Sequence, residues 1–289
     1  MKALIGYGKS YASFGEICQG RLSNQEDFLI TLPVNLWSTC ELICTEIEGE
    51  TEIDCPLIKS KLVAEKMVEI MDLTNGYYIK IIFTRNIPIG KGLSSSTADM
   101  LSVARAFQEV FGVIVTEPFI SNLFTEIESH DALHYYMSVV YNHRKGRILE
   151  KLNHIPLYKI IAIDEGSVID TIEYNKKLKF TPKHLNQYDQ IYRDIIDAFE
   201  RKDDVRIAEL TTLSAKFHAK RTNNDFIKVI HDYSKKLENC MGIITAHSGS
   251  FVGLLFPYDF SDDELKNQSQ KISITFDKEI IVLKSLRLI

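Results

Sequence analysis

The sequence predicts a mixed fold of helices and strands, with enough chain for one large domain or two modest ones. Its 289 residues can bury a sizeable core. Runs rich in Ile, Val and aromatic residues, such as residues 78–83 and 158–164, are typical of strands. A segment with apolar residues three or four apart, such as residues 60–73, is typical of an amphipathic helix.

The composition is that of an ordinary globular protein, with 45% hydrophobic and 25% charged residues. The net charge of −5 argues against a nucleic acid or an anionic membrane as partner, but not against a small nucleotide. We find no signal peptide and no apolar run of membrane-spanning length, so we expect no membrane partner. Five cysteines without a C-x-x-C pair predict a reducing, cytoplasmic setting, with Cys40 and Cys44 as buried strand thiols.

The N-terminal third should contain several strands and one helix. After residues 11–20, the pattern predicts strands over residues 27–34 and 38–47, with the single tryptophan, Trp37, in the turn between them. The amphipathic helix follows, and a turn at Asn75-Gly76 leads into strand 78–83.

The most informative stretch is IPIGKGLSSSTAD, residues 87–99, which lies between a strand and a helix that begins near Ser96 or Thr97. A helix N-terminus offers unpaired N–H groups and the positive end of the helix dipole, which suit a phosphate. Gly90 and Gly92 let the backbone approach a ligand, and Lys91 adds positive charge. Serine hydroxyls could bind phosphate oxygens or Mg²⁺.

The local pattern also fits a plainer interpretation, in which the serines cap an ordinary amphipathic helix. The spacing is not that of the Walker loop, because the lysine precedes the serines without the G-x-x-x-x-G-K-[ST] order. From the residues alone, both interpretations remain open.

This stretch resembles the second signature motif of the GHMP kinases, P-x-x-x-G-L-x-S-S, with Thr97 where alanine is usual. The lysine, serines and aspartate are most similar to the L-threonine kinase branch of cobalamin biosynthesis. The resemblance implies that ATP and Mg²⁺ bind here and favours the phosphate interpretation. The nucleotide would be held by Pro88, Gly90, Lys91, Gly92, Leu93, Ser94, Ser95, Ser96 and Thr97.

Residues 11–20 resemble the first motif of that branch, P-A-S-C-G-E-L-x-Q-G, although Tyr11 replaces the proline and Phe14 the cysteine. In GHMP kinases this motif lies at the substrate pocket. The resemblance therefore implies that Ser13, Glu16 and Gln19 contact the substrate, and the two replacements leave its identity the least constrained inference.

A helix that begins at Glu117-Pro118 leads to a group of acidic residues. Glu128-Ser-His-Asp131 lies where the L-threonine kinase branch has E-P-T-D. The resemblance implies that Glu128 and Ser95 or Ser96 bind Mg²⁺, which prefers hard oxygen ligands.

The same resemblance implies that Asp131 binds the substrate or acts as a base. The catalytic set would be Lys91, Ser96, Glu128 and Asp131. Without the resemblance, these acidic residues would be a solvated helix end. If the register of the motif is shifted by two residues, Glu126 is the alternative metal ligand. His130 would be a surface or cap residue.

The second half should begin with a charged turn at residues 143–147, strand 158–164 and a further strand over residues 168–172. Asp170 and Thr171 in the latter are candidate substrate or interdomain contacts. Residues 186–237 predict three helices, with breaks near residues 202–204 and 222–224.

Two strand-like runs then flank a tight turn, His247-Ser-Gly-Ser250, whose N–H groups could form an anion-binding nest. The turn resembles the A-H-S-G-[ST]-x-V-G motif of the same branch, and a hairpin without a ligand is the alternative. The resemblance implies substrate contacts from His247, Ser248, Gly249 and Ser250. A helix that begins near Ser261 and two strands, residues 272–276 and 280–286, should end the chain.

The three motifs occur in the family's order and span most of the chain. The resemblance implies an α+β, two-domain GHMP kinase fold, with a ribosomal-protein-like nucleotide domain over residues 1–155 and a ferredoxin-like domain over residues 156–289. It also implies transfer of the ATP γ-phosphoryl group to L-threonine. Alternatives are a kinase for serine, homoserine or another small alcohol, and a non-catalytic binding protein. A monomer and a homodimer both fit.

Overall fold

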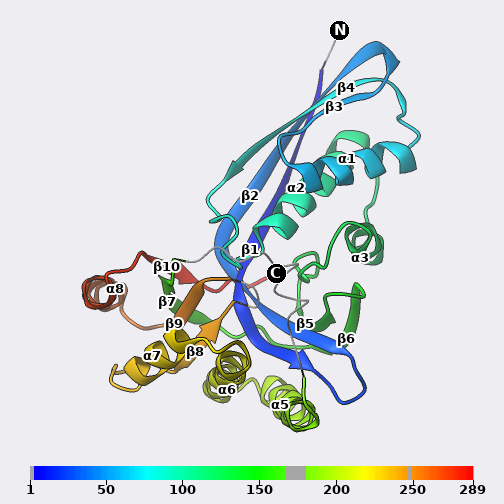
Figure 1. Ribbon diagram of the computed structural model, residues 1–289. Coiled ribbons are helices and arrows are strands. Elements are labelled where there is room, and N and C mark those ends of the chain that lie inside the picture. Colours follow the sequence, from blue (N-terminus) through cyan, green and yellow to red (C-terminus); the bar gives the residue numbers. More distant parts are fainter. Residues whose placement is uncertain (1–2, 167–179, 247–248, 289) are drawn as a thin grey trace.

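A long, curled sheet runs through the computed structural model, which describes residues 3–166, 180–246 and 249–288 (Figure 1). The strands are β1 (Leu4–Arg21), β2 (Asp27–Glu50), β3 (Glu52–Asp54), β4 (Asn75–Arg85), β5 (Ser138–Asn142), β6 (Arg147–Leu152), β7 (Tyr158–Asp164), β8 (Gly242–Thr245), β9 (Phe251–Pro257) and β10 (Ile280–Lys284). Their order is β10-β7-β9-β8-β1-β2-β4-β3, and the β5–β6 hairpin adds to β2.

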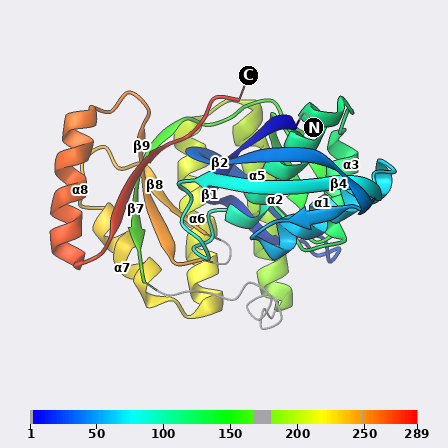
Figure 2. The ribbon, with the colours of Figure 1, turned by 90° about the horizontal axis from the view of Figure 1, so that it is seen from above.

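Helices cover the sheet in two groups, which Figures 1 and 2 show at its two ends. They are α1 (Ile58–Ile70), α2 (Ser95–Phe111), α3 (Glu117–Thr125), α5 (Pro182–Glu200), α6 (Asp204–Thr222), α7 (Asp225–Ser234) and α8 (Asp262–Phe276). The three helices predicted between residues 186 and 237 are confirmed as α5, α6 and α7, with breaks at the predicted places. Among the described residues, no helix combines the length and apolar character needed to cross a bilayer.

One long strand replaces the two strands and turn predicted around Trp37. Trp37 lies within β2 and pairs with Tyr11 of β1, while the next residue of β1, Ala12, pairs with Val34. The intervening residues form a bulge, so the break in the sequence pattern marks a kink in a continuous strand. The Trp37 ring contacts Tyr11 edge-on and lies 4.0 Å from the ammonium group of Lys9.

Helix α2 is fixed to the sheet by a buried polar network and by close backbone packing. Asp99 accepts hydrogen bonds from Ser38 of β2, at 2.6 Å, and from Arg85 of β4, at 2.5 Å. A Cβ at Gly8 of β1 would lie 1.8 Å from the backbone oxygen of Ser102 in α2. The helix therefore lies directly on β1, and its N-terminus is held at a defined place.

The end of the chain differs from the prediction in one element. Residues 272–276 continue α8 and do not form a strand. Leu265, Ser269 and Ile272 are buried at helical spacing, while Ile274 is 83% exposed. The β-branched residues suggested a strand, but the spacing of the buried positions is helical. The final strand is confirmed as β10, and the predicted strand with Asp170 and Thr171 lies outside the described residues.

The two halves of the sheet meet where β1 and β8 share one paired position, Glu16 opposite Thr245. Gly15, beside it, has φ +54°, and a Cβ there would lie 2.4 Å from the backbone oxygen of Thr245. Only glycine fits this contact without displacement of the backbone. A single hydrophobic cluster joins both sides, including Phe14 and Leu255. Glu16 consequently lies at a rigid junction.

Candidate active site

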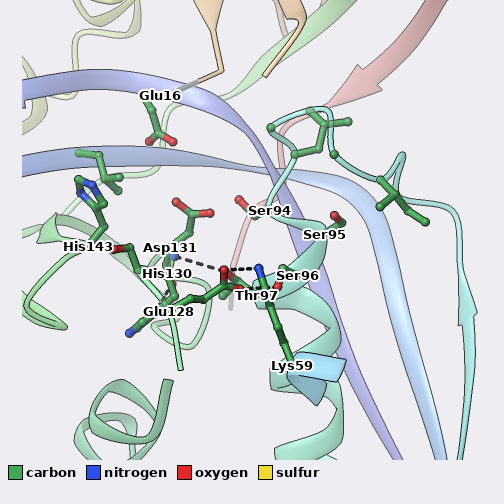
Figure 3. Close-up of a pocket in the computed structure, with 16 residues that line it drawn as sticks. Glu16, Lys59, Ser94, Ser95, Ser96, Thr97, Glu128, His130, Asp131 and His143 are labelled. Carbon is green, nitrogen blue, oxygen red and sulfur yellow. Dashed lines mark hydrogen bonds and ion pairs between the residues drawn. The ribbon is translucent and has the colours of Figure 1, made fainter. Parts of the chain in front are cut away.

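A cleft of about 260 Å³ opens at the N-terminus of α2, beside the junction of the two sheet halves. Figure 3 shows its lining residues, which come from β1, β2, α1, the loop before α2, the first turn of α2, the loop after α3 and the β5–β6 turn. They are Glu16, Leu29, Lys59, Ile89, Gly90, Gly92, Leu93, Ser94, Ser95, Ser96, Thr97, Glu128, Ser129, His130, Asp131 and His143. Most of the predicted nucleotide and metal residues therefore share one cavity.

The serines at the start of α2 do not act as ordinary helix caps. The helix begins at Ser95, and Ser94 before it has a left-handed backbone with φ +56°. Within the described part of the chain, the Ser94 side chain makes no capping hydrogen bond to the helix; its hydroxyl contacts the Ser13 hydroxyl instead. The capping interpretation is therefore wrong. The N–H groups at the start of the helix are therefore candidates to donate to an anion.

Glu128 approaches the start of α2 from the loop that follows α3. Its Oε1 accepts a hydrogen bond from the Ser96 hydroxyl, and its Oε2 lies 2.5 Å from the Nζ of Lys59 on α1. The side chain of Glu126 instead pairs with Lys66 at 3.1 Å and is 60% exposed. Glu128, not Glu126, thus lies at the cleft, and with Ser96 it offers the hard oxygen ligands that suit Mg²⁺.

Two further carboxyl groups, those of Asp131 and Glu16, face the same cleft (Figure 3). Loss of water around Asp131 raises its pKa to about 6, although a hydrogen bond with Ser94 opposes the shift. Burial and the charge of Asp131 raise the pKa of Glu16 well above its usual value. Glu16 is only 4% exposed, and its Oε2 has no hydrogen-bond partner among the described residues. A cationic ligand would satisfy both groups.

His130 is buried, not on the surface or at a cap as predicted, with only 2% of the residue exposed. Its Nδ1 lies 3.1 Å from the backbone oxygen of Asp131, and its Nε2 lies 3.2 Å from the Tyr141 hydroxyl. Burial lowers its pKa and favours the neutral ring. A neutral ring that donates from Nδ1 to the carbonyl of Asp131 leaves Nε2, which also lies 3.2 Å from the carbonyl of Ser121, to accept from the Tyr141 hydroxyl. This fixes the backbone of the loop that presents Glu128 and Asp131.

Lys91 is directed away from this cavity. Its Nζ lies 2.8 Å from Asp164 at the end of β7, and the Ser250 hydroxyl donates to the same carboxylate at 2.5 Å. Burial opposes ionisation of Asp164, but the hydrogen bonds from Lys91 and Ser250 outweigh it and lower the pKa. This network joins the loop before α2 to β7 and to the third motif.

The third motif lies against the back of the loop before α2. A Cβ at Gly249 would lie 2.1 Å from the backbone oxygen of Lys91, and a Cβ at Gly92 would lie 2.8 Å from the Cα of Gly249. These glycines allow direct backbone contact between the two motifs. Gly249 and Ser250 are therefore near the loop but do not line the cleft. The other two predicted residues, His247 and Ser248, lie outside the described residues.

Three predicted site residues lie outside the cleft lining: Ser13 and Gln19 are buried, and Pro88 is half-buried. Ser13 supports Ser94 from β1, and the backbone N–H of Gln19 donates to Ser214 of α6 at 3.2 Å. Pro88 precedes the cleft-lining part of the loop. The sequence interpretation missed Lys59 and His143, which also line the cavity. Neither belongs to a motif, and only the fold brings α1 and the β5–β6 turn to this place.

Comparisons with known proteins agree with this geometry. Residues 57–136 match the family described as the GHMP kinases N terminal domain. The L-threonine kinase of Citrobacter freundii is 25% identical over 262 residues, which cover 84% of both chains. The L-threonine kinase of Salmonella typhimurium is 26% identical over 261 residues, which cover 84% of this chain and 80% of that one.

Solved structures show the same fold. The homoserine kinase of Cytophaga hutchinsonii has a TM-score of 0.74 at 13% identity and covers 99% of this chain and 95% of its own. The mevalonate kinase of Methanococcus jannaschii has a TM-score of 0.72 at 15% identity and covers 99% of both. They confirm the predicted α+β GHMP kinase fold. The match of residues 57–136 to the GHMP kinases N terminal domain and the two kinase relatives support a phosphotransferase that acts on a hydroxyl group.

Proposed function

We propose that this kinase transfers the γ-phosphoryl group of ATP, with Mg²⁺, to the side-chain hydroxyl of L-threonine and forms O-phospho-L-threonine. The observation that carries the proposal is the uncapped start of α2, where the Ser96 hydroxyl meets Glu128 at the edge of a cleft that also holds Asp131. The two relatives named L-threonine kinase support the choice of acceptor.

The loop before α2 and the first turn of the helix would hold the phosphates of ATP. Its backbone from Gly90 to Ser96 combines glycines, a left-handed Ser94 and the N–H groups of a helix N-terminus without a Ser94 side-chain cap, and these donors suit phosphate oxygens. Mg²⁺ would bind the Ser96 hydroxyl and the Glu128 carboxylate and would neutralise phosphate charge.

In this reaction the protein mainly positions ATP and the substrate hydroxyl and forms no covalent bond to either. The bond between the γ-phosphorus and the bridging oxygen breaks, its electron pair leaves with ADP, and the substrate hydroxyl oxygen forms the new bond to phosphorus. We assign the hydroxyl proton to Asp131. With a pKa of about 6, its carboxylate is ionised at neutral pH and able to accept a proton.

Glu16 gives a reason for an acceptor that carries an ammonium group. Its buried Oε2 lacks a partner among the described residues, and Asp131 adds a second carboxyl group nearby. A substrate ammonium would relieve the charge repulsion between them.

The proposal also includes a nucleotide domain over residues 1–155 and a second domain over residues 156–289.

A coupled assay of ADP release tests the proposal. The acceptors are L-threonine, L-serine, L-homoserine, 1-amino-2-propanol and 3-hydroxybutyrate, which lacks the ammonium group. We expect turnover with threonine, little with 3-hydroxybutyrate, and loss of turnover in Glu128→Gln. Turnover with another alcohol would keep the kinase and replace the substrate. No turnover with any acceptor, with ATP still bound, would contradict the proposed acceptor class.

A further inference from the structure

We infer that Lys59 is a catalytic residue, whose ammonium group moves from Glu128 to the terminal phosphate of the nucleotide when Mg²⁺ takes the Glu128 carboxylate. Lys59 belongs to none of the sequence motifs and lies in the first turn of α1. The inference rests on the proposed function, because it concerns the same reaction.

The charge of the cleft is the first argument. The cleft lining contains three carboxyl groups, those of Glu16, Glu128 and Asp131, and Lys59 is the one lysine or arginine among the described residues that line it. His143, also in the lining, is neutral at pH 7 because burial lowers its pKa to about 4. Among the charged side chains that line the cleft, Lys59 is therefore the one that can offer a positive charge to a triphosphate.

The position of Lys59 is the second argument. Its Nζ lies 2.5 Å from Oε2 of Glu128, while Oε1 of the same carboxylate accepts from Ser96. The ammonium group is therefore next to both proposed metal ligands. Figure 3 places Glu16 at the opposite end of the cleft. Lys59 thus lies on the phosphate side, and Glu16 marks the acceptor side.

The mobility of Lys59 is the third argument. Its side chain is 47% exposed, and Glu128 is the ion-pair partner that the structure records for it. A partly exposed lysine has a flexible stem, and its ion pair is weak enough to exchange partners. Lys91, the other lysine of this region, instead lies 2.8 Å from the largely buried Asp164. The ammonium group of Lys59 is therefore better placed to follow charge that appears during phosphoryl transfer.

Two variants and a matched control test the inference by binding. Lys59→Met removes the charge and keeps the length, Lys59→Arg keeps the charge, and Lys61→Met changes an exposed lysine of the same helix whose Nζ is 4.0 Å from Glu65. Calorimetry with Mg²⁺ would compare a non-hydrolysable ATP analogue with ADP. We expect Lys59→Met to weaken the analogue about tenfold and ADP less than about twofold, since one charged hydrogen bond to the terminal phosphate is lost. Lys59→Arg should retain the preference for the triphosphate, and Lys61→Met should match the wild type.

Turnover gives the second measurement. We expect kcat of Lys59→Met to fall about 100-fold while the KM for threonine changes less than about threefold. A raised threonine KM with unchanged analogue affinity would place Lys59 at the acceptor and overturn the inference. Equal losses for analogue and ADP, or no loss, would also overturn it. If the wild type phosphorylates none of the acceptors, the proposed acceptor class fails, while the binding comparison still decides the role of Lys59.

Discussion

Helix α2 has left-handed backbone at both of its ends, but the surroundings of the two ends differ. At the C-terminal end, Gly112 has φ +67°, its N–H donates to the Gln108 carbonyl at 2.9 Å, and a Cβ would meet nothing within 4 Å. This is an ordinary helix stop. At the N-terminal end, Ser94 has φ +56° but gives the helix no side-chain cap within the described residues. The two ends share a conformation, but of the two residues only Ser94 lines the cleft, so left-handed backbone alone does not mark a site.

Among the changes that test the difference between the two ends of α2, loss of the Ser96 hydroxyl should have the largest effect. We expect Ser96→Ala to lower kcat about 100-fold and to raise the Mg²⁺ concentration needed for half-maximal rate, since a proposed metal ligand is removed. Ser95→Ala is the matched control, because Ser95 lines the cleft without the contact to Glu128 that Ser96 makes. Steady-state kinetics across Mg²⁺ concentrations measure both. A larger loss in Ser95→Ala would move the metal site by one residue.

The next effect concerns the loop that precedes the helix. Gly92→Ala should destabilise the protein by about 2–4 kcal/mol and reduce turnover, because Gly92 has φ +78° and its new Cβ would lie 2.6 Å from the Cβ of Ala246. Urea unfolding gives the stability. A neutral result would mean that the loop and the third motif can separate freely, which would remove the structural link between them.

His130 should matter through the loop that it holds. We expect His130→Phe to lower kcat/KM about tenfold, because the Phe ring keeps the packing against Phe124 but cannot donate to the Asp131 carbonyl. His130→Asn should restore part of the loss. His134→Phe removes a neighbouring buried imidazole that bonds Ser121 and not the loop, so its kcat/KM should stay within about twofold of the wild type. Equal losses in both variants would point to general destabilisation of the core.

The pH dependence tests Asp131. Its pKa is raised to about 6, so protonation on acidification should remove the proton acceptor, and kcat at pH 5 should be about tenfold below its plateau. At higher pH the carboxylate is ionised and the rate should level off. Asp131→Asn should be slow and lack this inflection. A wild-type profile that stays flat between pH 5 and 7 would show that Asp131 is not the base.

The smallest effect belongs to the other end of the helix. Gly112→Ala should cost about 1 kcal/mol, the usual penalty for a Cβ in left-handed backbone, because the space around Gly112 is open. Turnover per folded molecule should not change. Thermal unfolding together with an activity assay measures both quantities. A loss of turnover would mean that the two ends of α2 are coupled.

The sequence by itself determined where most elements lie. Apolar spacing indicated α1, α2 and the three helices α5, α6 and α7, and β-branched runs indicated β4, β7 and β9. The glycines and serines of residues 90–96 marked the loop before α2 as a candidate site, and the resemblance to the GHMP kinases favoured phosphate binding over helix capping. The predictions from local sequence patterns were wrong at two places. Trp37 lies within a strand and not in a turn, and residues 272–276 are helical and not a strand.

Only the tertiary structure decided which polar groups meet. Lys59, Ser96 and Glu128 come from three separate elements, and no spacing rule relates a residue of α1 to the loop after α3. The sequence also did not show where side chains point. Lys91 of the second motif forms an ion pair with Asp164, and His130, between Glu128 and Asp131, is buried. Sequence patterns record burial and turns along the chain. The charge of a cleft depends on which distant side chains the packing of α1, α2 and β1 brings together.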